Sequence, residues 1–236
     1  MGAVVGVLGG SGGVGASSFA AVLAAVAGES VFIDLDACGG GVDIALGIET
    51  APGARWSGLR VAGGRLDPDV LVGGLPRWGP VPVLAADVAT FDPDAVLQVL
   101  QAARAGPLVV ADLPRASCPE RAAALLHCDI VVVLARADVA GLVAAHAVAA
   151  ALPEVPVGVV VRRGEIAARE AAALVGHPLL GELPALGGSR FELGPARLPR
   201  ALTRVARGIL AGLTAPAGHV ASSRAGASAR PAAVLA

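Results

Sequence analysis

The chain of 236 residues contains no lysine, so all 18 of its basic side chains are arginines. No lysine is therefore present to bind a phosphate, to form a Schiff base or to act as a general base. Tyrosine is also absent and aromatic residues make up only 3% of the chain, which argues against a surface on which nucleic-acid bases stack. Because the net charge is only −1, we expect no specific binding of nucleic acid.

The chain also has few cysteines and no long apolar run. Its 3 cysteines show neither a C-x-x-C pair nor a zinc-ligand spacing, and such sparse thiols are typical of a reducing compartment. No basic region precedes the first apolar stretch, and no stretch reaches the roughly 18 unbroken apolar residues of a membrane span. We therefore expect a cytoplasmic protein without a signal peptide or a transmembrane helix.

Two kinds of apolar segment alternate along the chain. Short continuous runs are typical of buried parallel strands, and they are expected at 3–8, 31–34, 81–85, 107–112, 130–135, 155–161 and 179–183. Longer segments between them predict helices at 17–27, 93–105, 119–126, 138–152, 165–175 and 196–213. Glycine-rich residues 38–43 are expected to be flexible, and residues 50–80 to be mostly loops with a short helix near 67–73.

This alternation predicts an α/β fold, a doubly wound, mostly parallel sheet with helices on both faces. One domain is expected to span residues 1–213. Residues 214–236 are dominated by Ala, Gly, Ser, Pro and Arg without periodicity, so a disordered tail is expected there. In such a sheet, ligands bind where the strands end.

The stretch from Gly9 to Gly15 organises the N-terminal part of the chain. Glycine occupies all but two of its positions, and it lies between the first predicted strand and the first predicted helix. Glycines allow backbone N–H groups to approach a phosphate closely, and a helix N-terminus adds partial positive charge. The stretch therefore predicts an anion site made by the backbone, although a tight turn without a ligand would also explain the glycines.

Two nucleotide-binding motifs overlap on this stretch. Residues 10–17 fit the P-loop pattern G-x4-G-K-[ST], with Ala16 in place of the lysine. Residues 10–15 also fit the dinucleotide pattern G-x-G-x-x-G, in which Asp34, about 20 residues further on, would bind ribose hydroxyls. The two patterns imply different chemistry, and the acidic residues help to choose between them.

Carboxylates follow two of the predicted buried strands. Asp34 and Asp36 flank Leu35, so both are expected to point the same way and to hold or orient water around Mg²⁺. Asp112 ends another strand and is similar to a Walker B aspartate, which holds Mg²⁺ directly or through water, although it could also cap a loop. The Walker-B-like strand favours the P-loop interpretation over the dinucleotide one.

The predicted C-terminal helix carries arginines on one face and apolar residues on the other. The arginines recur at spacings of three and four, at Arg197, Arg200, Arg204 and Arg207. A helix that lies on a membrane surface has this pattern. A final helix packed on the core with a solvated basic face has it too, and that interpretation is favoured because core packing itself demands amphipathicity.

These motifs together resemble the MinD/ParA-type deviant Walker A proteins, whose loop reads K-G-G-x-G-K-[TS]-[TS]. Residues 11–18 keep that frame, 32–36 resemble the family's second acidic element, and 109–114 resemble its Walker B. Residues 131–134 with the helix from Asp138 are similar to the region before the adenine pocket, and 178–184 to the last strand and its G-x-[IL]-P turn. The resemblance covers about residues 3–213 and implies a MinD-like P-loop NTPase fold.

Within that family the chain looks closest to a degenerate branch, the CpaE/TadZ-like pilus-assembly proteins and the actinobacterial septum site-determining proteins. The similarity lies in residues 34–43, 55–59 and 112–115. Members often carry an N-terminal receiver-like domain, so this chain resembles only the part that follows it. The branch implies a spatial regulator or localisation scaffold, a homodimer, pilus-assembly or cell-division partners, and a place in the cytoplasm, at the inner membrane face or at a pole or septum.

Functional residues follow from the resemblance position by position. It implies nucleotide binding by Gly10, Ser11, Gly12, Gly13, Val14, Gly15, Ala16, Ser17, Ser18 and Arg162. It implies Mg²⁺ binding by Ser17, Asp34 and Asp112, and orientation of the attacking water by Asp36.

The departures from the family concern charge. Ser11 and Ala16 replace both family lysines, and Arg162 stands where the family has an asparagine beside the adenine. Losing a preorganised cation from a phosphoryl-transfer site costs about 3–4 kcal/mol of transition-state stabilisation. Weak binding of ATP or ADP, with or without Mg²⁺, is therefore expected, and hydrolysis that is lost or very slow. The alternatives are a slow ATPase helped by Arg115 or a partner's arginine, a nicotinamide- or flavin-dependent Rossmann enzyme, and an interaction module with an empty pocket.

Overall fold

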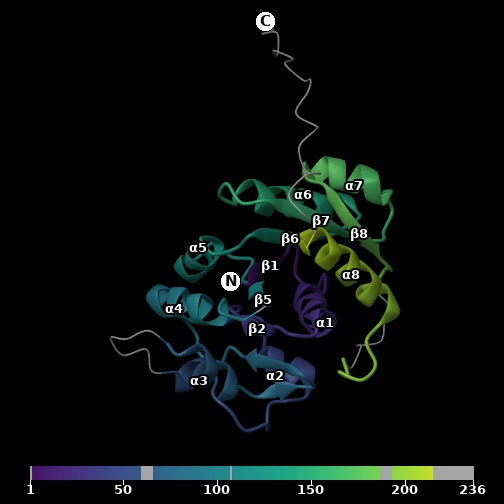
Figure 1. The fold of residues 1–236 in the computed structure, drawn as a ribbon. Helices are drawn as coiled ribbons and strands as arrows, with labels where there is room; N and C mark the ends of the chain where they lie inside the picture. The colour runs from purple at the N-terminus through teal and green to yellow at the C-terminus, as the bar shows by residue number, and fades with distance from the viewer. Residues whose placement is uncertain (1, 60–65, 107, 187–192, 215–236) are drawn as a thin grey trace, which may run out of the picture.

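The computed structural model describes residues 2–59, 66–106, 108–186 and 193–214. An eight-stranded sheet in the order β3-β4-β2-β5-β1-β6-β7-β8 forms its centre (Figure 1). All neighbouring strands are parallel except β3 and β4, which are antiparallel. The strands are β1 (Ala3–Gly9), β2 (Val31–Asp34), β3 (Arg77–Trp78), β4 (Val81–Leu84), β5 (Leu108–Leu113), β6 (Ile130–Arg136), β7 (Val157–Arg162) and β8 (Leu179–Leu183).

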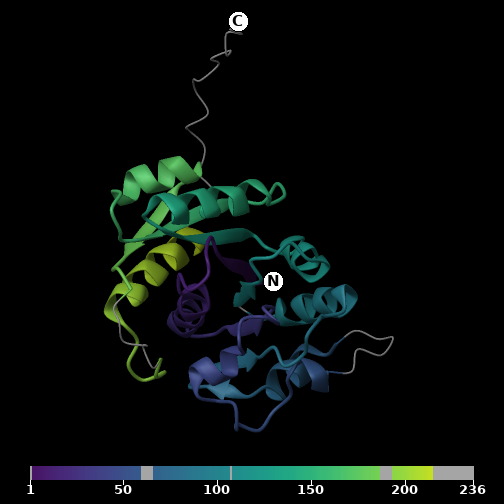
Figure 2. The ribbon, with the colours of Figure 1, turned by 180° about the vertical axis from the view of Figure 1, so that it is seen from behind.

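Helices cover both faces of this sheet, as the two opposite views show (Figures 1 and 2). They are α1 (Ala16–Ala27), α2 (Val42–Leu46), α3 (Pro68–Gly73), α4 (Pro93–Ala103), α5 (Pro119–Leu125), α6 (Val139–Ala150), α7 (Ala168–Val175) and α8 (Arg200–Thr214), with a 3₁₀ turn at Trp56–Gly58. Side chains of α1, α2 and α8 share one apolar cluster with the strands, and those of α3 to α7 share the other. The predicted doubly wound, mostly parallel sheet is therefore confirmed.

Several helix ends obey the expected capping chemistry. Asp92 accepts a hydrogen bond from the backbone N–H of Asp94 at the start of α4, and Asp138 accepts one from Gly141 at the start of α6. Each replaces a hydrogen bond that the first turn of a helix lacks. The short helix expected near 67–73 is present as α3 and is capped by Asp67.

Other expectations need correction. Residues 42–46 form α2, although the segment 38–43 was expected to be flexible. The edge strand β3 falls within residues expected to be loops. Helix α8 begins at Arg200 rather than at 196, because the ring of Pro199 disfavours helical backbone at the residue before it. Except for Thr214, the expected tail lies outside the described residues, so its boundary stays a prediction.

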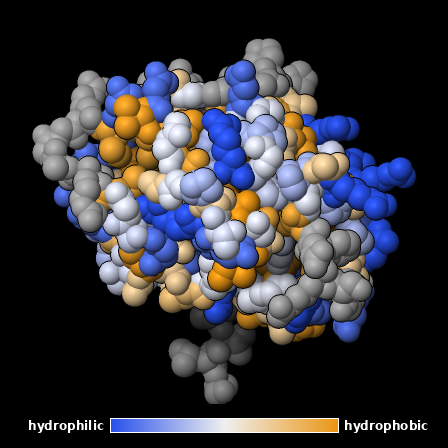
Figure 3. All heavy atoms as spheres, turned by 90° about the horizontal axis from the view of Figure 1, so that it is seen from below, coloured by the Kyte–Doolittle hydropathy of each residue, from blue (hydrophilic) through white to orange (hydrophobic). Residues whose placement is uncertain are grey.

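The final helix α8 is packed on the core. Leu202, Val205 and Ile209 are at most 8% exposed and belong to the cluster shared with α1, whereas Arg204 and Arg207 on the opposite side are exposed. The favoured interpretation of the amphipathic pattern is therefore confirmed. Among the described helices none has the length and apolar character needed to cross a membrane. Figure 3 shows the molecule from below the view of Figure 1, and on this face hydrophilic residues alternate with small clusters of hydrophobic residues.

Candidate functional site

The loop between β1 and α1 has the conformation that its glycines predict. The Gly10 N–H donates to the Leu134 carbonyl at 2.8 Å, which ties the start of the loop to β6. Gly13 and Gly15 have φ angles of 71° and 88°, in the left-handed region that glycine enters without steric cost. A Cβ placed on Gly12 or Gly13 would meet no atom within 4 Å. One wall of the loop therefore faces open space.

The N-terminus of α1 follows directly and has no side-chain cap. Gly15 occupies the N-cap position, where it cannot supply a side-chain acceptor for the first N–H groups of this 12-residue helix. The helix dipole places partial positive charge at the same point. Uncapped N–H groups, a dipole and an open glycine loop are the features with which a helix N-terminus can bind an anion without any lysine.

Ser11 supplies an independent indication of a ligand. Its hydroxyl oxygen is buried and has no hydrogen-bond partner among the described residues. A buried polar group without a partner costs about 1–3 kcal/mol, so such atoms usually meet water or a ligand. The hydroxyl lies in the loop that the sequence assigns to phosphate, and a phosphate oxygen would satisfy it. The residues present therefore fit a phosphate group.

Carboxylates meet where β2 and β5 end, on one side of the loop. Asp34 and Asp112 are direct neighbours in the register of these two strands and are only 2% and 3% exposed. Burial raises the pKa of Asp112 well above its usual value, the charge of Asp34 raises it further, and a hydrogen bond with Ser17 opposes the rise. Burial also raises the pKa of Asp34 to about 6. The structure thus places Ser17, Asp34 and Asp112 close together, and their binding of Mg²⁺ stays a prediction.

The oxygens of Asp34 are largely occupied by the protein itself. They accept backbone N–H groups from Asp36 at 3.0 Å, from Val42 at 3.2 Å and from Ala86 at 3.2 Å. A carboxylate has about four lone-pair sites, so roughly one remains for a metal or water. This arrangement disfavours the dinucleotide alternative, in which both oxygens of Asp34 would bind a ribose. Asp34 joins the segments that follow β2 and β4.

Asp36 lies further from the sheet and is half-buried. Its carboxylate accepts the Cys38 N–H at 3.2 Å, which closes a local turn. Its charge raises the pKa of both Asp34 and Asp112, so the three carboxylates lie within electrostatic range of one another. No group of three or more His, Cys, Asp or Glu side chains in the described ranges has a geometry that could hold a metal ion. Mg²⁺ would therefore need phosphate oxygens to complete its coordination.

The structure places Arg162 against the backbone of the glycine loop. Its Nε donates to the Val14 carbonyl at 2.8 Å and its Nη1 to the Pro184 carbonyl at 3.0 Å. The residue is 5% exposed, and burial lowers the pKa of its guanidinium. The resemblance had assigned this position to the nucleotide base, whereas the guanidinium lies on the carbonyl side of the loop.

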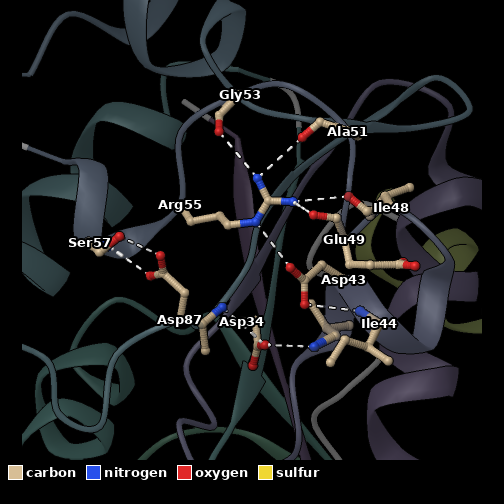
Figure 4. Close-up of polar contacts among 12 residues, drawn as sticks. Asp34, Asp43, Ile44, Ile48, Glu49, Ala51, Gly53, Arg55, Ser57 and Asp87 are labelled. Carbon is tan, nitrogen blue, oxygen red and sulfur yellow. Dashed lines mark hydrogen bonds and ion pairs between the residues drawn. The ribbon is translucent and has the colours of Figure 1, made fainter.

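Sequence reasoning assigned no role to Arg55, which connects the segment between β2 and β3 (Figure 4). Its guanidinium pairs with Asp43 at 3.0 Å and donates to the carbonyls of Ile48, Glu49, Ala51 and Gly53. The next residue, Trp56, donates its indole N–H to the Asp34 carbonyl at 2.8 Å. Arg55 therefore helps to hold the end of β2 in place. The signal in the sequence was the similarity of residues 55–59 to the degenerate branch, which gave Arg55 no structural role.

Comparison with curated proteins finds two similar sequences. No family model matches the chain. Two curated proteins of Mycobacterium tuberculosis, from the CDC 1551 / Oshkosh and H37Rv strains, are each described as uncharacterized and are 40% identical over 222 residues. The match covers 89% of this chain and 63% of each relative, so the chain spans less than two-thirds of their length.

Solved structures share the architecture at low sequence identity. A ParA family ATPase from Chlorobium tepidum TLS has a TM-score of 0.73 and 17% identity, over 87% of this chain and 98% of that one. The cell division ATPase MinD of Pyrococcus furiosus has a TM-score of 0.70 and 19% identity, over 89% and 99%. The septum site-determining protein MinD of Pyrococcus horikoshii OT3, complexed with Mg-ADP, has a TM-score of 0.64 and 18% identity, over 91% and 99%. The predicted MinD-like P-loop fold is therefore confirmed.

Proposed function

We propose that this chain is a localisation protein of the MinD/ParA type that binds a nucleotide weakly and hydrolyses it very slowly or not at all. Its preformed glycine loop carries the proposal, because left-handed glycines, an uncapped helix and the unpartnered Ser11 hydroxyl meet at one place. The shared fold adds support, since one solved MinD relative is complexed with Mg-ADP. ATP or ADP is the proposed ligand.

Residues 10–18 are proposed to surround the phosphates with their N–H groups, as at other helix N-termini. Ser17 and Asp112 are proposed to hold Mg²⁺ between the phosphates and β5, with the remaining lone pair of Asp34 on a bound water. When bound, the metal would neutralise phosphate charge. Burial raises the pKa of Asp112, and the charge of a bound Mg²⁺ would favour its ionised carboxylate.

Slow or absent turnover follows from the missing lysines. Ala16 brings no charge to the loop, and the chain has no lysine elsewhere to replace it. Losing one preorganised cation of this kind lowers the turnover rate by roughly 10²–10³-fold. Asp36 is proposed to orient the attacking water in whatever turnover remains. The nucleotide would then act as a signal that changes the protein's contacts rather than as a fuel.

The assembly state and the cellular role belong to the same proposal. We propose a homodimer formed across the nucleotide face, which acts in septum placement or in pilus assembly of the CpaE/TadZ type. One structure with the same fold is a MinC:MinD cell division protein complex from Aquifex aeolicus, with 18% identity to this chain. Its name supports a protein partner for this fold. A place in the cytoplasm, with peripheral attachment to the membrane, a pole or the septum, completes the proposal.

Isothermal titration calorimetry with ATP and ADP, each with and without Mg²⁺, tests the binding. Gly13→Val places a branched side chain at a positive φ on the open wall of the loop and is expected to remove binding. Gly176→Val is the matched control, because Gly176 also has a positive φ and open space but lies between α7 and the edge strand β8, away from β1. Saturable binding that only Gly13→Val loses supports the proposal. Absence of binding at millimolar nucleotide would refute it.

A slow ATPase is the second candidate, favoured by one feature of the loop after β5. Arg115 follows Asp112 closely and is exposed, and its carbonyl is held by the buried Arg121 at 2.7 Å. We propose that the Arg115 guanidinium, three positions after Asp112, replaces the missing cation. Steady phosphate release that Asp36→Ala abolishes and Arg115→Gln reduces, in folded protein, would establish this activity; a rate equal to buffer would exclude it.

A further inference from the structure

Arg162 is a buried cation at the end of β7 that contacts the glycine loop and has no counter-charge among the described residues. Its two bonded nitrogens reach main-chain carbonyls on separate segments, Val14 in the loop and Pro184 after β8. No carboxylate of the described residues forms an ion pair with it. Leaving a charge buried without an opposite charge is costly. A neutral donor could also bridge the two carbonyls, so the buried positive charge of Arg162 requires another explanation.

The geometry of a peptide bond provides one. The described chain has no cis peptide, and in a trans peptide the C=O and N–H groups point in opposite directions. The Val14 carbonyl faces Arg162, so the N–H of Gly15 in the same peptide faces away from it. Gly15 is the N-cap of α1, so an N–H that faces away from Arg162 is expected to face the proposed anion site. Arg162 and an anion would thus lie at the two ends of one peptide dipole.

A cation at the oxygen end of a peptide strengthens the N–H at the other end. Hydrogen bonds in series polarise one another, and the effect is larger in a site with little water. The guanidinium also lies close to the loop, since a Cβ on Gly15 would come within 2.9 Å of its Nη2. The charge of Arg162 can therefore stabilise an anion through this peptide, although no side chain enters the loop. The space beside Gly12 and Gly13 stays open for the ligand.

Charged residues of opposite sign lie on the two sides of the proposed anion site. Asp34 and Asp112 end β2 and β5 on one side of β1, whereas Arg162 ends β7 on the other side. A bound phosphate chain would carry its metal ion on the carboxylate side and leave its uncompensated oxygens toward Gly15. The distribution of charge matches a phosphate group with a divalent cation attached at one end.

We infer that Arg162 is a positioning residue that supplies the charge of the missing loop lysine through the Val14–Gly15 peptide, for binding of a nucleotide phosphate. This inference rests on the proposed nucleotide binding and names the group that makes it possible without lysine. The arginine does not touch the ligand. It strengthens the donor at Gly15 and holds the loop in its binding conformation.

Three variants test the inference. Arg162→Gln keeps an amide donor but removes the charge, and Arg162→Lys keeps the charge with fewer donors. Arg163→Gln is the matched control, because Arg163 is the next residue, 67% exposed and paired with Glu182 on the surface. Affinities for Mg-ADP and for inorganic pyrophosphate are measured by calorimetry at several salt concentrations, and the amide shift of Gly15 is followed by NMR.

Arg162→Gln is expected to weaken binding of both ligands by roughly tenfold, to reduce its salt dependence and to move the Gly15 amide signal in the ligand-free protein. Arg162→Lys is expected to restore part of the affinity, and Arg163→Gln to resemble the wild type. If Arg162→Gln does not fold, Arg162→Met, which is unbranched and uncharged, replaces it as the charge-removing variant. Wild-type affinity in a charge-removing variant, or tighter binding, would overturn the inference alone. No binding of either ligand by the wild type would overturn the proposed function with it.

Discussion

Replacing Asp34 by asparagine should change the stability of the protein in a way that depends on pH. Burial raises the pKa of this carboxyl from 3.8 to about 6. The folded state therefore binds more protons than the unfolded chain between these two values. The contribution of Asp34 to stability is fully present below pH 3.8 and is lost as the pH rises through about 6. Asparagine does not titrate, so Asp34→Asn escapes this loss.

The size of the effect follows from the difference in pKa. A pKa that is about 2 higher in the folded state than in the unfolded chain corresponds to about 3 kcal/mol over the whole titration. The asparagine amide cannot accept from all three backbone N–H groups that Asp34 binds, and the lost bond costs about 1–3 kcal/mol at every pH. The unfolded carboxyl is already mostly ionised at pH 4, so the relative stability of Asp34→Asn should rise by about 2 kcal/mol between about pH 4 and pH 7.5, whatever its constant offset. Loss of the Asp34 charge also lowers the pKa of Asp112, which acts in the same direction.

Urea unfolding followed by tryptophan fluorescence measures this difference. The chain has two tryptophans and no tyrosine, so the signal comes from Trp56 and Trp78 alone. Trp56 is hydrogen-bonded to the carbonyl of Asp34 and reports directly on the site. Asp94→Asn, which alters an exposed aspartate in the first turn of α4, is the control. A difference between Asp34→Asn and wild type that is equal at both pH values, or that moves in the opposite direction, would refute the reasoning.

Three further outcomes are expected. Arg55→Ala breaks a largely buried ion pair and four hydrogen bonds to carbonyls, so the free energy of unfolding measured in urea should fall by about 3 kcal/mol. Arg163→Ala, which breaks an exposed ion pair, should lower it by less than about 1 kcal/mol. Equal losses in the two variants would contradict this expectation. Ala16→Lys should tighten Mg-ATP binding in calorimetry by at least about tenfold, while Ala27→Lys, at the other end of α1, should not. Asp112→Asn should remove the Mg²⁺ dependence of ADP binding and keep the metal-free affinity; an unchanged dependence would exclude Asp112 as a ligand.

The sequence predicted the sheet well because buried parallel strands are continuous apolar runs. Strands β1, β5 and β6 are buried on both faces, so nearly every residue contributes to the signal. The glycine loop was equally clear, since left-handed backbone at Gly13 and Gly15 requires that residue type. These features are local, and local features can be recognised in one sequence.

The parts that escaped prediction depend on contacts between distant residues. The bond from Arg162 to Val14 spans 148 positions, and that from Ala86 to Asp34 spans 52. No periodicity announces such pairs. Helix α2 was hidden by the glycines that precede it, because a glycine cluster predicts flexibility unless a neighbouring segment packs on it, as Arg55 does here through Asp43.

Local backbone geometry and contacts between distant residues together explain how a phosphate loop could work without lysine. The loop keeps its shape because glycine permits it and because Arg162 and Leu134 bind its backbone from outside. Its donors are peptide N–H groups, whose strength depends on what lies at the opposite end of each peptide. A lysine inside the loop moves with the transferred group and stabilises charge during transfer, whereas a fixed arginine behind the loop acts on any bound phosphate alike. A site of this kind favours binding over turnover, since uniform stabilisation of ligand and transition state does not accelerate the reaction.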